Sequence, residues 1–129
     1  MHKHVHLILA TTTAVVTACG LAQAARPLPG YQCLALNMTA AQAADPNFML
    51  TVRRAPSDHA PILGTEGALL IAADPVIQQN GYIQITRTNG SVGWIPASSA
   101  KPWRSPNPAS NVRCYPEILD NGRVGFTTR

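Results

Sequence analysis

The pattern of hydrophobic and polar positions predicts short β-strands along most of the chain after residue 30. Segment 81–88 alternates strictly, so that Tyr82 and Ile83 fall on opposite faces of one strand. Apolar or β-branched runs bounded by Gly and Pro predict the other strands. They cover residues 31–37, 48–57, 61–64, 68–74 and 91–96.

Two Asn-Gly pairs predict hairpin turns. Asn89-Gly90 joins segment 81–88 to the strand that ends at Pro96, and we expect a two-residue turn with positive φ at both central positions. The same chemistry returns at Asn121-Gly122, because "TNGSVGW" (88–94) is echoed by "DNGRVGF" (120–126). Too few residues follow Pro96 for a second domain. We therefore expect a second hairpin in the tail.

Little helix is expected. Thr39 and Gln42 stand at the spacing of a capping box, and Pro46 follows the alanines, so residues 39–46 predict one or two helical turns. Segment 97–100 predicts a single turn, and 101–110 is a proline-rich connector without periodicity. Short strands with frequent turn residues predict an all-β barrel or sandwich.

The first 24 residues resemble an export signal. A basic start is followed by the apolar run Val5–Val16 and by Ala22-Gln23-Ala24, a small-x-small cleavage site. The apolar run is shorter than the roughly 20 residues that a membrane span needs. The alternative is cleavage before Cys19, whose surroundings resemble a lipoprotein box. We therefore expect a periplasmic or secreted protein, attached to a membrane only if Cys19 is lipidated.

The net charge is a mild +4, from ten Lys and Arg against six Asp and Glu. The basic residues are scattered along the chain, so we expect a solvated surface and no nucleic-acid partner. After export, Cys33 and Cys114 remain as a natural disulfide pair, whose long loop would stabilise the fold by about 4 kcal/mol. A metal-binding or catalytic cysteine needs further ligands or a base, and His59 is the only histidine outside the signal. No metal or cofactor is expected.

Segment 48–100 resembles the bacterial SH3-like domain, with the motifs "LTVRRAPS", "PILGTEGALLIAAD", "NGYIQI" and "NGSVGWIP" in the family's order. The residues on the pattern are Leu50, Val52, Arg53, Pro56, Ser57, Gly64, Gly81, Ile83, Gly90, Gly93, Trp94 and Ile95. The chain departs from the family at Thr51, usually asparagine, and at Tyr82, usually tryptophan. Residues 101–129 lie outside the pattern.

The resemblance implies a five-stranded, partly open SH3-like barrel and a binding role, since family members often accompany cell-wall hydrolases and are thought to hold peptidoglycan. We divide the chain into a signal (1–24), a strand with a helical turn (25–47), the barrel (48–100) and a connector with a C-terminal β-hairpin extension (101–129). Tied to the N-terminal strand by the disulfide, this hairpin is expected to extend or cover the barrel edge.

No arrangement of residues predicts catalysis. Ser57, Asp58 and His59 are consecutive, and neighbouring side chains cannot readily aim at one another as a triad requires, so an exposed polar loop is expected. No glycine-rich phosphate loop opens a helix. We therefore do not expect an enzyme.

Binding is the better hypothesis, because aromatic rings hold apolar stems and guanidinium groups hold carboxylates. The candidate ligand-binding residues are Arg53, Arg54, His59, Tyr82, Trp94 and Trp103. Each also has a structural interpretation: Trp94 can be barrel packing, Trp103 can seal the barrel edge, and Arg53 and Arg54 point to opposite faces.

Two function classes follow. One is an exported binding module for cell-wall peptidoglycan or an extended peptide. The other is a structural or regulatory subunit that binds another envelope or secreted protein through the tail hairpin. An open groove lined by Arg53, Tyr82 and Trp94 would favour the first, and a groove filled by the tail would favour the second.

Overall fold

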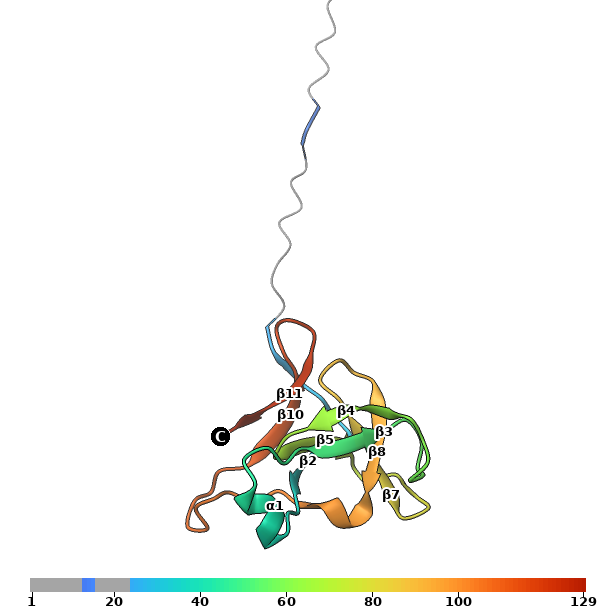
Figure 1. Ribbon diagram of the computed structural model, residues 1–129. Coiled ribbons are helices and arrows are strands. Elements are labelled where there is room, and N and C mark those ends of the chain that lie inside the picture. The colour runs from blue at the N-terminus through green and yellow to red at the C-terminus, as the bar shows by residue number, and fades with distance from the viewer. Residues whose placement is uncertain (1–12, 16–23) are drawn as a thin grey trace, which may run out of the picture.

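A computed structural model describes residues 13–15 and 24–129 of the protein (Figure 1). The predicted signal and the lipidation site at Cys19 lie outside the described residues, apart from 13–15 and Ala24. In the described part, no helix has the length and apolar character needed to cross a membrane.

The described chain is built mainly of short strands, which confirms the all-β class. The elements are β1 (Arg26–Pro27), β2 (Tyr31–Leu36), α1 (Ala40–Ala44), β3 (Leu50–Arg53), β4 (Ile62–Glu66), β5 (Leu69–Ala73), β6 (Gln78–Gln79), β7 (Tyr82–Thr86), β8 (Val92–Pro96), the 3₁₀ turn η1 (Ala97–Ser99), β9 (Ala100–Pro102), β10 (Cys114–Ile118) and β11 (Val124–Thr128). The capping box predicted for α1 is present: Gln42 N–H donates to Thr39 Oγ1, and Thr39 N–H donates to Gln42 Oε1.

The strands form two antiparallel sheets. The larger has the order β4-β3-β8-β7-β5-β2-β9, with β6 also paired to β7, and the smaller has the order β1-β10-β11. The five strands expected from segment 48–100 are therefore neighbours, but the sheet is larger because β2 pairs with β5 and then with β9. Its end strands β4 and β9 do not pair in the described chain, so no closed barrel forms.

The turn between β7 and β8 differs from the two-residue turn expected. Arg87 N–H donates to Ser91 O (2.8 Å) and Gly90 N–H donates to Arg87 O (2.8 Å), which makes a three-residue loop. Within this loop only Gly90 has a positive φ, of 84°. The backbone of Asn89 is not in the left-handed region. Its side-chain Oδ1 accepts the N–H of Ser91 (2.9 Å), and this bond holds the loop locally.

The tail turn is built in the same way. Gly122 N–H donates to Leu119 O (2.9 Å), Leu119 N–H donates to Arg123 O (2.8 Å), and Gly122 has φ of 79°. Asn121 Oδ1 accepts the N–H of Arg123 (3.0 Å), as Asn89 accepts that of Ser91. The repeated motif is therefore a repeated turn, and β10 and β11 are the predicted tail hairpin.

The main core lies on one face of the large sheet. Its buried residues are Leu34, Leu36, Leu50, Val52, Leu70, Ala72, Ile83, Ile85 and Ile95. On the opposite face, Cys33 and Ile71 form a second cluster with Val124 of β11. Leu70 and Ile71 are thus both buried, on opposite faces, which explains why β5 reads as an unbroken apolar run.

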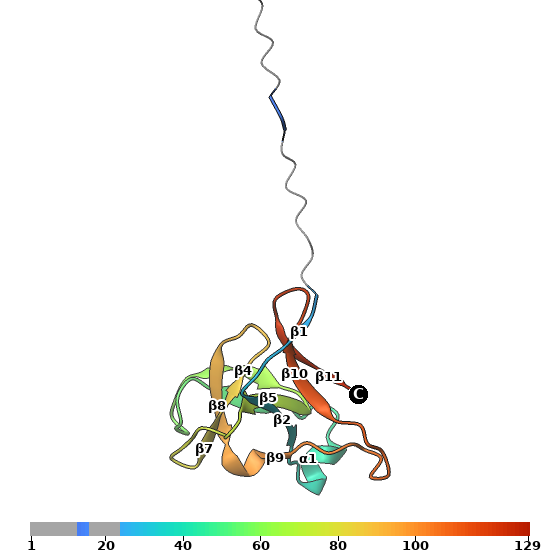
Figure 2. The ribbon, with the colours of Figure 1, turned by 180° about the vertical axis from the view of Figure 1, so that it is seen from behind.

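The predicted disulfide between Cys33 and Cys114 is present, with the two Cα atoms 6.1 Å apart. It joins β2 to β10 and so holds the small sheet against the large one. Figure 2 shows β1 alongside β10, with the C-terminus at the end of β11. The tail was expected to extend or cover an edge of the barrel. It packs instead on the outer face of β2 and β5, because Val124 is buried there against the apolar surface of Cys33 and Ile71.

Candidate functional site

Three of the predicted binding residues share one face of the large sheet. Arg53 of β3 is paired with Trp94 of β8, and Trp94 is paired with Gln84 of β7. Directly paired residues of antiparallel strands point to the same side, and Tyr82 lies two residues from Gln84. Arg53, Trp94 and Tyr82 are therefore brought together, on the side opposite the main core.

The loop between β3 and β4 covers this face. Arg53 Nη1 donates to the carbonyl of Ala60 (2.9 Å), and the Tyr82 hydroxyl donates to the carboxylate of Asp58. Tyr82 and Trp94 are consequently buried, with exposures of 7% and 9%. The loop between β3 and β4, and not the tail, therefore forms hydrogen bonds with Arg53 and Tyr82, which were expected to bind a ligand.

Arg54 and His59 lie on this loop with exposed side chains. The loop is held by backbone bonds: Arg54 N–H donates to Pro61 O (2.9 Å), and His59 N–H donates to Ser57 Oγ (3.1 Å). Ser57 and Asp58 are thus engaged in holding the loop. The side chains of Arg54 and His59 remain accessible to a ligand, whereas Tyr82 and Trp94 are buried.

A groove of about 650 Å³ lies elsewhere, between β2, the connector 103–113 and β10. Its aromatic lining residues are Tyr31, Trp103 and Tyr115, and its charged lining residues are Arg104 and Arg113. The lining contains no Asp or Glu. Because its charged lining side chains are two guanidinium groups, the groove is suited to an anionic ligand.

The connector is shaped by local side-chain bonds, which is why it shows no periodic pattern. Asn107 Oδ1 accepts the N–H of Ala109 (3.0 Å), and Ser110 Oγ accepts the N–H of Val112 (3.0 Å). Such bonds let short polar side chains replace a strand ladder. Trp103 is half-buried because it packs against the Cys33 cluster and also lines the groove.

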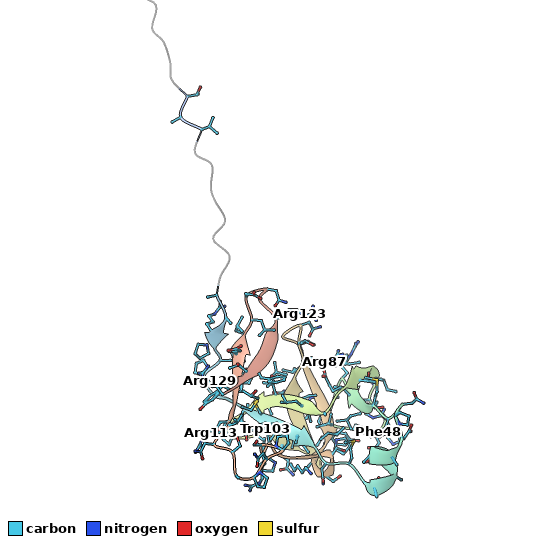
Figure 3. The ribbon with its side chains drawn as sticks, turned by 90° about the vertical axis from the view of Figure 1, so that its left-hand side faces the viewer. Phe48, Arg87, Trp103, Arg113, Arg123 and Arg129 are labelled. Carbon is cyan, nitrogen blue, oxygen red and sulfur yellow. A yellow bond between two sulfur atoms is a disulfide. The ribbon has the colours of Figure 1, made fainter. Side chains whose placement is uncertain are left out.

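Arginines continue beyond the lining of the groove. The guanidinium carbon of Arg129 lies 4.5 Å from the ring centroid of Tyr115, a cation–π contact. Figure 3 shows Trp103, Arg113 and Arg129 on one side of the molecule. Tyr115 therefore both contacts Arg129 and belongs to the lining of the groove.

Of the residues that line this groove, the sequence analysis proposed only Trp103 for ligand binding, and it assigned Cys33 and Cys114 to the disulfide. Tyr31 and Tyr115 were missed because they lie far apart in the chain and meet only when the disulfide joins β2 to β10. A local sign was present, since Tyr31 stands two residues before Cys33 and Tyr115 directly follows Cys114. Aromatic residues beside paired cysteines would have pointed to this region.

No group of three or more His, Cys, Asp or Glu side chains within residues 13–15 and 24–129 could hold a metal ion. Comparisons with protein-family models, curated proteins and solved structures find no match.

Proposed function

We propose that this chain is an exported, non-catalytic binding module of the SH3-like class, which holds an extended peptide that carries carboxylates, such as the peptide of cell-wall peptidoglycan. The observation that carries the proposal is the groove beside the disulfide, whose lining includes three aromatic residues and two arginines and no Asp or Glu.

The groove suits a peptide in both size and chemistry. Its volume of about 650 Å³ is within the usual range of about 300–1,000 Å³ for ligand sites. Flat rings contact the apolar stems of side chains at little entropic cost, and a guanidinium group binds a carboxylate through two parallel hydrogen bonds. Arg104 and Arg113 therefore bind the carboxylates, while Trp103 and the tyrosines contact the stems between them.

The strand order supports the SH3-like class. The strands β4, β3, β8, β7 and β5 all come from segment 48–100, which resembles the family, and they are consecutive neighbours in one sheet. Added to them are β2 and β9 at one end of the sheet and the disulfide-bound tail. The groove is built by these added parts. A disulfide also suits an oxidising compartment, as expected of an exported protein.

The alternative function is a structural or regulatory subunit that binds another envelope or secreted protein. The outer edge of β11 favours it, because this edge pairs with no strand of residues 24–129 and such an edge is a template for another chain.

Retention on insoluble peptidoglycan tests the proposal. Arg113→Glu is compared with Arg123→Glu, which makes the same change of charge on the tail turn, outside the groove. Loss of a charge-assisted hydrogen bond predicts about tenfold weaker retention for Arg113→Glu and little change for the control.

A third variant, Arg54→Glu, separates the groove from the loop between β3 and β4. If Arg54→Glu abolishes retention and Arg113→Glu does not, ligand binding belongs to the loop. Absence of retention by the oxidised wild-type protein at low salt, where such contacts are strongest, would refute wall binding.

A further inference from the structure

The strand β11 is the outer strand of the small sheet. It pairs with β10 on one side, and within the described chain no strand pairs with its other side. Figures 1 and 2 show β11 beside β10 with the C-terminus at its end. Such an edge presents backbone donors and acceptors in a row.

The ladder with β10 shows which backbone groups point outward. Arg113 and Arg129 exchange two hydrogen bonds, N–H to O, of 2.9 and 3.1 Å. Because hydrogen-bonded and non-hydrogen-bonded pairs alternate in antiparallel strands, the backbone groups of residues 124, 126 and 128 face away from β10. Val124 agrees, since its N–H donates to Thr88 O (2.9 Å).

Phe126 and Thr128 therefore turn their N–H and C=O groups outward. Phe126 is paired with Pro116 in a non-hydrogen-bonded position of the ladder, and the carbonyl of Pro116 faces β1, where it accepts the N–H of Leu28 (3.0 Å). These two residues contribute four of the outward backbone groups of the edge. Its length suits a short segment.

A hollow of about 90 Å³ lies beside this edge, lined mainly by apolar residues that include Leu69, Ile71, Val124 and Phe126, with Glu66, Thr86 and Thr88 as its polar lining residues. The Phe126 side chain is 44% exposed, on the same side of β11 as buried Val124. A residue paired with Phe126 from outside would point its side chain to this same side. The hollow has room for one small aliphatic side chain.

We propose that the edge of β11 binds an extended segment of a partner protein as an added strand, with a valine-sized side chain in the hollow beside Phe126. Arg123 and Arg129 stand at the two ends of the strand (Figure 3), so acidic residues at the ends of the segment complement it. This site is separate from the groove and does not depend on peptide binding there; it specifies the contact that the alternative function would use.

A second copy of the chain fits this edge less well. Because the N–H of Val124 is already bonded to Thr88 O, self-pairing through β11 would use Phe126 and Thr128 and bring one of these two residues opposite Phe126. A phenyl ring is too large for the hollow, and a threonine would place one methyl group there where a valine places two. A segment with an aliphatic residue at this position avoids both costs.

The test uses the oxidised protein and a synthetic peptide, acetyl-Glu-Thr-Val-Thr-Val-Thr-Glu-amide, followed by amide hydrogen exchange. Saturating peptide is expected to slow exchange of the Phe126 and Thr128 amides about tenfold or more, with less change at Thr127, which already faces β10. The matched control peptide carries N-methylated valines, which keep the side chains and lack the N–H donors. It is expected not to bind.

Two variants locate the contact. Thr128→Pro removes one outward N–H, whereas Thr128→Ala keeps it, so we expect about tenfold weaker peptide binding for the proline variant and unchanged binding for the alanine variant. Lys101→Glu, which reverses a charge on exposed β9 of the large sheet, is expected to leave peptide binding unchanged.

Equal binding of the N-methylated peptide, or no protection of the two amides at millimolar peptide, would overturn the proposal. Protection without peptide that rises with protein concentration, together with a dimer in sedimentation, would assign the edge to a second copy and would also overturn it.

Discussion

The packing around Gly93 gives the sharpest test of the core. A Cβ at this position of β8 would lie 2.3 Å from Val52 Cγ1, about 1 Å closer than ordinary contact. Val52 is fully buried on the neighbouring strand β3 and has little room to move. Gly93 does not have positive φ, so the backbone accepts alanine and the penalty is steric alone.

The magnitudes follow from this contact. Gly93→Ala overpacks the core and is expected to lower the free energy of unfolding by about 3 kcal/mol. Val52→Ala removes two buried methyl groups and is expected to cost about 2 kcal/mol. In the double variant the colliding Cγ1 is absent and the new methyl fills part of the cavity. The pair should therefore cost about 2 kcal/mol in total, well below the sum of the two single effects.

Urea unfolding followed by tryptophan fluorescence measures each variant, with the disulfide intact in all. Gly67→Ala is the control, because a Cβ there meets nothing within 4 Å and φ is outside the left-handed region, so we expect a change within about 0.5 kcal/mol. If Gly93→Ala is as stable as the control, or if the double variant is simply additive, the proposed collision with Val52 does not exist.

Three further predictions concern the tail and the loop that carries Asp58. Replacing Cys33 and Cys114 by serine is expected to cost about 4 kcal/mol in urea unfolding, and a loss below about 1 kcal/mol would show that the bond adds little constraint. Gly122→Ala is expected to cost about 1 kcal/mol because φ is 79°, and Gly122→Asn less; equal stability of the two variants would argue against a left-handed residue. Tyr82→Phe removes the hydrogen bond to Asp58 and is expected to speed amide exchange in that loop, whereas unchanged exchange would mean that the bond does not hold it.

Local features could be predicted because their causes act over a few residues. The alternation of segment 81–88 identified β7, and the spacing of Thr39 and Gln42 identified α1 with its capping box. The turn at Asn89-Gly90 was predicted in place but not in type. The Asn89 side chain accepts a hydrogen bond from Ser91, and this added bond accompanies a three-residue loop.

The candidate site could be predicted only in part. Arg53, Tyr82 and Trp94 do share a face, as strand alternation allows, but the covering loop depends on the bonds to Ala60 and Asp58. These bonds join residues whose side chains no local pattern relates. Trp103 was selected as an aromatic residue in the connector, and its neighbours in the groove came from other segments.

By itself the sequence determined the approximate positions of the longer strands and of the Asn-Gly turns, and the pairing of Cys33 with Cys114, because alternation, turn chemistry and cysteine count need no knowledge of distant neighbours. The short strands β1, β6 and β9 were not predicted, and β9 falls where a turn and a proline-rich connector were expected. Only the tertiary structure decided that β2 lies beside β5, that the tail sheet covers their outer face, and that Tyr31 and Trp103 line one groove. Those arrangements depend on how all buried apolar surfaces are satisfied together, and no single segment contains that information.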